Sequence, residues 1–127
     1  MTDISAIRGA TTAENTVESI LENTKELLKE VLSANNLQIE DLFSVIFTCT
    51  KDLDAAYPAA AAREMGITKA SLMCAQEMHV KGSLEKCIRL QVLAKNPFCR
   101  EPVHVYLKKA KALRPDLFYK SEDLYGD

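Results

Sequence analysis

The sequence predicts a single α+β domain built on a mixed sheet of about five strands, with one long helix and one short helix. A long apolar stripe at three- and four-residue steps predicts the long helix, and several short runs rich in β-branched side chains predict the strands. The 127 residues are 47% hydrophobic, which suits one core and leaves little material for a second. We therefore expect residues 1–127 to form one domain that ends in a polar tail over about residues 115–127.

The N-terminal part should form a strand and then the long helix. Side chains alternate from Ile4 to Ala10, which predicts the first strand. Asn15 can then cap a helix and Glu18 can complete the capping box. The helix should end near Asn35-Asn36, because asparagine tolerates the left-handed conformation that ends helices. Its apolar stripe consists of Val17, Ile20, Leu21, Leu27, Leu28, Val31 and Leu32.

The remaining elements should be four strands and a short helix. Residues 42–48 are almost continuously apolar, which predicts a central strand covered on both faces. The segment from Pro58 to Met65 predicts a short helix, with proline in its first turn and Gly66 beyond its end. Three further strands are expected at residues 70–75, 87–94 and 103–107. So small a sheet has exposed edges, which another subunit commonly covers, so the pattern favours an oligomer.

Composition excludes several classes of function. The formal net charge is -2, from 16 basic and 18 acidic residues, so no general positive field would attract nucleic acid or an anionic membrane. The first residues lack a basic leader, and no apolar run is long enough to span a bilayer, so we expect a cytoplasmic protein. The cysteines form no Cys-x-x-Cys pair and the two histidines lie near none of them at ligand spacing, so we expect no metal site. These cysteines are Cys49, Cys74, Cys87 and Cys99.

Four polar side chains could belong to a site, although each also has an ordinary structural interpretation. Arg89 lies in the middle of a strand on its non-apolar side, where it could face solvent or line a pocket. Arg8 stands before Gly9, where the backbone could turn tightly and approach a ligand. Glu77 follows an apolar segment and could be an exposed loop residue. Tyr106 could be a core residue whose hydroxyl reaches the surface.

Several short segments are more informative together than singly. They are Ile7-Arg8-Gly9-Ala10-Thr11-Thr12, Cys74-Ala75-Gln76-Glu77-Met78, Cys87-Ile88-Arg89, His104-Val105-Tyr106 and Leu113-Arg114-Pro115-Asp116-Leu117. In order and spacing, over nearly the whole chain, they resemble the AroH-class chorismate mutases. Residues 52–63, with Tyr57-Pro58-Ala59 and Ala62-Arg63, are also similar to a segment that a neighbouring subunit donates in that family.

The resemblance implies a homotrimer whose sheets close into a pseudo-α/β-barrel core, with three active sites between adjacent subunits. It implies an isomerase that converts chorismate to prephenate by an intramolecular Claisen rearrangement, in phenylalanine and tyrosine biosynthesis on the shikimate pathway, with no metal or cofactor. Arg89 and Glu77 would be catalytic. One chain would supply the substrate contacts Arg8, Cys74 and Tyr106, with Met73 at the rim, and the next would supply Tyr57, Ala59 and Arg63. Leu113 and Arg114 would help the tail cover the mouth of the site.

The sequence departs from the family pattern at the rim of this implied site. Ala60 stands where several members carry a lysine, and Tyr57 and Met73 replace a phenylalanine and a threonine. Losing the lysine should weaken substrate capture more than the chemical step.

Two alternatives remain open. A Rid-like imine deaminase has a similar trimeric fold, but its arginine-containing strand signature is not found here. A non-catalytic trimer that binds an aromatic-pathway metabolite would have no need of Glu77 beside Arg89.

Overall fold

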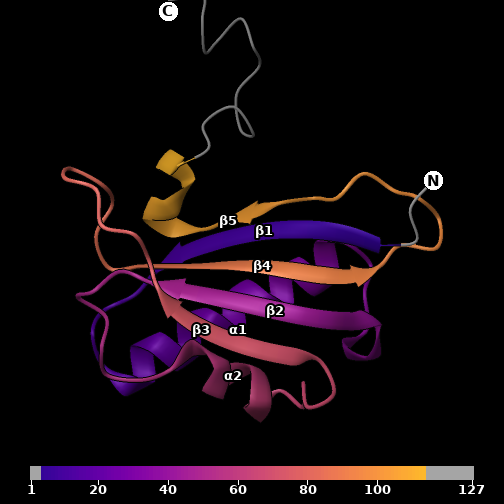
Figure 1. The fold of residues 1–127 in the computed structure, drawn as a ribbon, viewed down its shortest axis with the longest axis horizontal. Helices are drawn as coiled ribbons and strands as arrows, with labels where there is room; N and C mark the ends of the chain where they lie inside the picture. The colour runs from indigo at the N-terminus through magenta and orange to yellow at the C-terminus, as the bar shows by residue number, and fades with distance from the viewer. Residues whose placement is uncertain (1–3, 114–127) are drawn as a thin grey trace, which may run out of the picture.

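The computed structural model describes residues 4–113, in which five strands form one mixed sheet (Figure 1). The strands are β1 (Ile4–Thr12), β2 (Leu42–Cys49), β3 (Ser71–Gln76), β4 (Cys87–Lys95) and β5 (Val105–Tyr106). Their order across the sheet is β3-β2-β4-β1-β5. Strand β4 is antiparallel to β1 and to β2, whereas β3 and β5 add in parallel at the edges. The predicted α+β fold is confirmed, although β4 and not β2 is the middle strand.

Both helices cover the same face of the sheet. Helix α1 (Val17–Ala34) connects β1 to β2, and helix α2 (Pro58–Glu64) connects β2 to β3. Such crossovers are what parallel strands require. Two short 3-10 turns, η1 (Ile39–Asp41) and η2 (Lys108–Leu113), were not expected from the sequence. Within the described residues, no helix is long and apolar enough to cross a membrane.

The main core lies between the sheet and the two helices. Alternate residues of the strands point into it, including Ile7, Phe47, Leu90 and Val92, and Leu27 of α1 packs against them. Cross-strand register places Gly9, Leu90, Phe47 and Cys74 in one row that faces the helices. The sheet therefore buries one complete set of alternating side chains.

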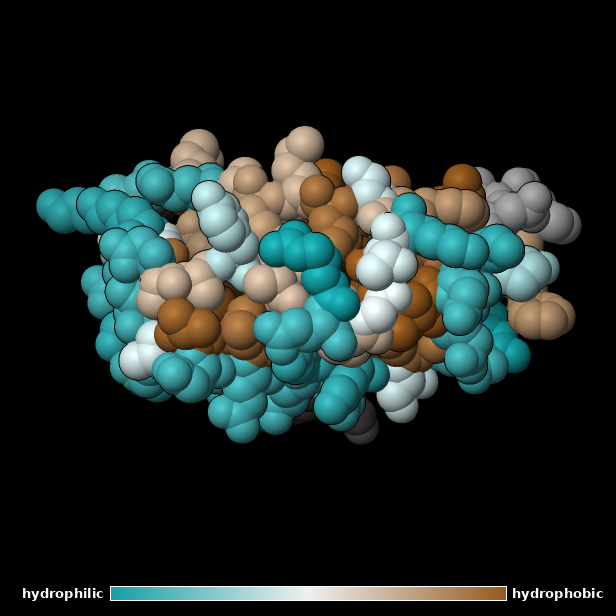
Figure 2. Space-filling view, turned by 90° about the horizontal axis from the view of Figure 1, so that it is seen from below, coloured by the Kyte–Doolittle hydropathy of each residue, from teal (hydrophilic) through white to brown (hydrophobic). Residues whose placement is uncertain are grey.

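The opposite set of side chains forms what we call the open face. Two rows across the sheet define it, Arg8–Gln91–Ile46–Met73 and Tyr106–Ala10–Arg89–Thr48–Ala75. Ile46 is 38% exposed and Met73 is 59% exposed, so the prediction that β2 is covered on both faces is wrong for the single chain. Figure 2 shows hydrophobic side chains along the rim that borders this face, whereas the rim on the helix side is mostly hydrophilic.

Gly9 has a different role from the one that its neighbour Arg8 suggested. Strand β1 continues to Thr12, so Gly9 makes no turn toward a ligand but pairs with Leu90 and Val105 inside the sheet. A Cβ atom added at Gly9 would lie 3.1 Å from Leu90 Cδ1, 3.2 Å from Leu27 Cδ1 and 3.3 Å from the Val105 carbonyl oxygen. A side chain at this position would therefore be tightly packed, because Leu27 of helix α1, Leu90 and the Val105 backbone all lie close to the strand.

We expect the Gly9→Ala variant to lose about 1–3 kcal/mol of unfolding free energy, because the added methyl overpacks a fully occupied core. Denaturant unfolding followed by circular dichroism measures this loss. Adding Leu27→Ala removes one of the three contacts. The double variant should therefore lose less unfolding free energy than the sum of the losses in the two single variants. Additive costs would mean that Leu27 does not create the restriction.

The start of α1 also differs from the prediction. Thr16 caps the helix by accepting a hydrogen bond from the Ser19 amide at 3.1 Å, so the expected Asn15 capping box is wrong. The Asn15 side chain instead accepts hydrogen bonds from the backbone amides of Asp54 and Ala55 at 2.9 and 3.0 Å. Asn15 thus holds the segment that leads to α2. The expected end of α1 is confirmed, with Asn36 in the left-handed region at φ 54°.

Candidate functional site

Arg89 and Glu77 meet on the open face of the sheet. Arg89 projects from the third position of β4, and its Nε atom lies 3.4 Å from Glu77 Oε1. The Arg89 side chain is 46% exposed and that of Glu77 is 25% exposed. A pair this exposed contributes little to stability, at most about 1 kcal/mol. Its value is geometric, because it places a carboxylate and a guanidinium side by side at an accessible surface.

Glu77 is held in place by the two strands beside it. It follows directly after β3, and its amide donates a hydrogen bond of 2.8 Å to the Cys49 carbonyl oxygen of β2. The Thr48 hydroxyl donates a hydrogen bond of 2.6 Å to Glu77 Oε1. Thr48 was not identified from the sequence, because its link to Glu77 depends on the pairing of β2 with β3.

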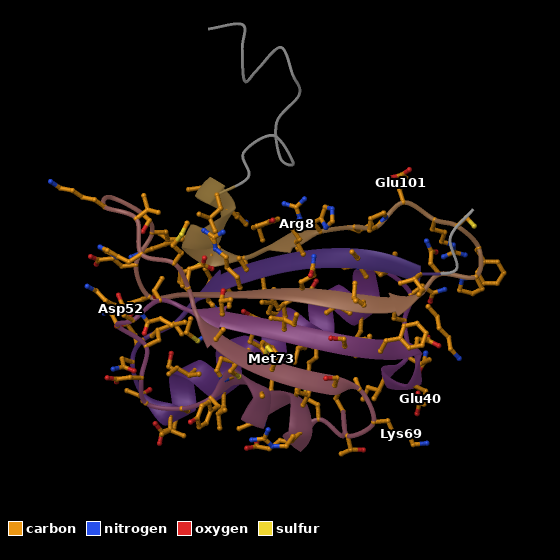
Figure 3. All side chains as sticks on the ribbon, viewed as in Figure 1. Arg8, Glu40, Asp52, Lys69, Met73 and Glu101 are labelled. Carbon is orange, nitrogen blue, oxygen red and sulfur yellow. The ribbon has the colours of Figure 1, made fainter. Side chains whose placement is uncertain are left out.

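Arg8 and Tyr106 border the same part of the open face. Arg8 lies opposite Gln91 in the β1–β4 pair, two positions from Arg89 along the strand, which corresponds to a separation of roughly 7–8 Å between the two Cα atoms. Figure 3 shows Arg8 above the middle of the sheet. Arg8, Arg89, Tyr106 and Leu113 line a small cavity of about 140 Å³. Tyr106 is 7% exposed, and it packs with buried residues of β1, β4 and η2.

A larger cavity of about 450 Å³ lies elsewhere on the same chain. Tyr57, Pro58 and Cys74 are among its lining residues, and Tyr57 is 72% exposed. Cys74 belongs to the sheet row that faces the helices and packs against the main core. The Cys74 side chain thus points to the face of the sheet opposite Arg89, and it lines the same cavity as Tyr57.

The other expected site residues are more scattered. Ala59 is 5% exposed and packs in the main core, so its side chain is not free to contact a ligand. Arg63 is exposed near the end of α2, on the helix side of the sheet. Met73 lies on the open face, as Figure 3 shows. Arg114 lies outside the described residues.

The cysteine thiols are free among the described residues. Burial raises the pKa of Cys49 to about 12, and neighbouring Cys74 adds to this increase. Burial also raises the pKa of Cys87, which the nearby Arg89 guanidinium partly opposes. Both thiols therefore remain protonated at neutral pH and behave as small apolar residues. Within residues 4–113, no three His, Cys, Asp or Glu side chains converge to hold a metal ion.

The open-face arrangement is suited to a small anionic ligand. Two guanidinium groups provide planar, permanently charged donors, and the Glu77 carboxylate provides an acceptor beside them. Tyr106 and Leu113 supply an apolar wall. On one chain, however, the Arg89–Glu77 pair is accessible to solvent, so a complete binding cleft would need further walls.

Comparison with known proteins gives consistent matches. The model of the family chorismate mutase type I matches residues 4–117. Chorismate mutase AroH of Bacillus subtilis is 43% identical over 117 residues, covering 90% of this chain and 92% of that protein. Chorismate mutase AroH of Thermus thermophilus is 46% identical, covering 90% and 96%. A solved chorismate mutase from Clostridium thermocellum is 50% identical, with a TM-score of 0.79, covering 85% of this chain and 98% of that one.

Proposed function

The chain belongs to the type I chorismate mutase family, and from this membership we propose that it rearranges chorismate to prephenate in clefts shared by neighbouring copies of the chain. The observation that carries the proposal is the pairing of Arg89 with Glu77 on an accessible sheet face, beside Arg8 and Tyr106. The family match also weighs against the Rid-like imine deaminase hypothesis.

The reaction needs positioning and electrostatics more than acid–base chemistry. In the rearrangement, the ether carbon–oxygen bond breaks while a carbon–carbon bond forms within the same molecule, so no proton has to move. Chorismate is a flexible dianion, and the protein must hold its compact reactive conformer. Arg8 and Tyr106 bind one carboxylate, and the fork of Arg89 contacts the other carboxylate and the ether oxygen.

Arg89 stabilises the transition state more than the bound substrate. The ether oxygen gains negative charge as its bond breaks, and a fixed guanidinium beside it interacts more strongly as this charge grows. Glu77 accepts a hydrogen bond from the ring hydroxyl and lies near the ring carbon that becomes electron-poor. The opposed charges of Arg89 and Glu77 thus match the charge separation that develops across the substrate.

A second copy of the chain supplies the remaining walls of the cleft. Tyr57 lines a cavity whose lining does not include Arg89, and Arg63 lies on the helix side of the sheet, which favours their supply by a neighbouring copy. The uncovered Ile46 and Met73 of the open face also favour packing against other copies. We infer a homotrimer with three such clefts.

The free thiols and the absence of any need for a cofactor suit a cytoplasmic enzyme of aromatic amino acid biosynthesis on the shikimate pathway. The formal net charge of the chain is -2, so neither nucleic acid nor a membrane is an expected partner.

The direct test is to follow the loss of chorismate absorbance with purified protein in a buffer that contains a metal chelator. We expect saturable turnover, with prephenate as the product identified by mass spectrometry. Isothermal titration calorimetry with chorismate provides the second measurement. Binding without turnover would support the non-catalytic metabolite-binding alternative, and absence of both would remove the proposed function.

A further inference from the structure

We propose that Thr48 is a positioning residue that assigns the two oxygen atoms of Glu77 to different tasks, Oε1 to the protein and Oε2 to the substrate. This inference rests on the proposed function, since it concerns how Glu77 meets the chorismate hydroxyl. Thr48 acts through Glu77 and touches no substrate atom itself.

The contacts of the Glu77 carboxylate carry the assignment. Oε1 accepts a hydrogen bond of 2.6 Å from the Thr48 hydroxyl and lies 3.4 Å from Arg89 Nε. Among residues 4–113, no hydrogen bond to Oε2 is found, and the ion pair with Arg89 makes its contact at Oε1. An ionised carboxylate only accepts hydrogen bonds, so the free oxygen is the one available to a substrate hydroxyl.

The position of Thr48 in the sheet explains why it can perform this role. It lies directly opposite Arg89 in the β2–β4 pair and opposite Ala75 in the β2–β3 pair. Its hydroxyl therefore stands between the strand that carries Arg89 and the strand that leads to Glu77. The Glu77 backbone is already held by the Cys49 carbonyl oxygen, so Thr48 has only to fix the side-chain torsions.

Without the hydroxyl, Arg89 would be the only group that holds the Glu77 carboxylate. Both side chains of the pair are partly exposed to solvent. The distance of 3.4 Å between Arg89 Nε and Glu77 Oε1 is longer than that of a strong charge-assisted hydrogen bond. The carboxylate would then rotate and approach the guanidinium with both oxygens. That arrangement would engage Oε2 and would compete with the substrate for the Arg89 fork.

Thr48→Val is the informative variant, because valine keeps the shape of the side chain and removes only the donor. We expect kcat to fall about tenfold, with KM changed by less than about twofold, since the arginines that bind the substrate carboxylates are intact. Thr48→Ser should retain kcat within about twofold, because it keeps the hydroxyl. Thr68→Val, the same change at an exposed position beyond α2, should leave kcat unchanged.

A double-variant comparison tests whether Thr48 acts through Glu77. In a Glu77→Ala background, adding Thr48→Val should lower the residual kcat by less than about twofold, because the hydroxyl no longer has a side chain to orient. An equal tenfold loss in both backgrounds would overturn the proposal, as would a Thr48→Val enzyme with unchanged kcat.

A crystal structure of the substrate-free Thr48→Val protein gives a readout that does not depend on activity. We expect the Glu77 carboxylate to leave its wild-type orientation against Arg89 in this variant and to keep it in Thr48→Ser. An unmoved carboxylate in Thr48→Val would overturn the positioning role. Failure of the wild-type protein to rearrange chorismate would instead overturn the proposed function, and the crystallographic comparison would still decide whether Thr48 orients Glu77.

Discussion

The Arg89→Ala variant is expected to lose roughly 10³-fold or more in kcat while it remains folded. Removing one neutral donor from a preorganised site costs about 10²–10³-fold, and Arg89 supplies a full charge with two or more donors. Its loss leaves Glu77 with the Thr48 hydrogen bond, and the half-exposed ion pair contributes little to folding. Steady-state kinetics with chorismate and a circular dichroism melting curve measure the two effects.

Two comparison variants separate charge from geometry. Arg89→Lys keeps the positive charge but loses the planar fork, so we expect most of the kcat loss to remain. Lys95→Ala removes a cation from the same face of the same strand, six positions from Arg89, and should leave kcat unchanged. If Arg89→Ala turned over chorismate at the wild-type rate, Arg89 could not be the group that stabilises the ether oxygen.

The strand that carries Arg89 could be predicted because its pattern is local. Apolar residues occupy every second position of β4 from Ile88 to Ala94, which fixes the face of every side chain once one face is buried. The same rule separates the side chains of Cys74 and Glu77. Three positions separate these residues along one extended segment, so their side chains point to opposite faces. The spacing alone contained that information.

Other features depend on contacts that no local pattern reveals. Thr48 meets Arg89 and Glu77 only because β2 lies between β3 and β4, a strand order that does not follow the chain. Asn15 is a residue type that commonly caps helices, but its side chain instead binds the Asp54 backbone amide. Thr16 caps the helix in its place. A polar residue before a helix can serve either purpose, and the distant partner decides.

The apolar run of β2 was misinterpreted for a different reason. A nearly continuous apolar strand indicates burial on both faces, yet Ile46 is uncovered in the single chain. The sequence is selected for the state in which the protein functions, which in our proposal includes neighbouring copies. The same argument explains why Ala59 and Arg63, expected at the site, lie apart from Arg89 here.

A mixture of two inactive variants should recover about one quarter of the activity of the same amount of wild-type protein, if each cleft takes Arg89 from one chain and Arg63 from the next. Arg63→Glu places a negative charge against the dianionic substrate, and Arg89→Ala removes the stabilising guanidinium, so each homotrimer should be nearly inactive. In a random equal mixture, a cleft is intact only when an Arg63→Glu chain supplies Arg89 and an Arg89→Ala chain supplies Arg63. Each condition holds half of the time, which gives about one quarter of the clefts.

The experiment needs chains that exchange, so the two variants are denatured together, refolded, and assayed beside each variant refolded alone. Wild type refolded with Arg89→Ala is the matched control. About half of its sites should be intact, because every chain then carries Arg63 and half of the chains carry Arg89. Recovery in the mixed sample must come from complementary halves, because neither parent contains an intact cleft. Activity no higher than that of the parents would place both arginines on the same chain, contrary to their positions on opposite sides of the sheet.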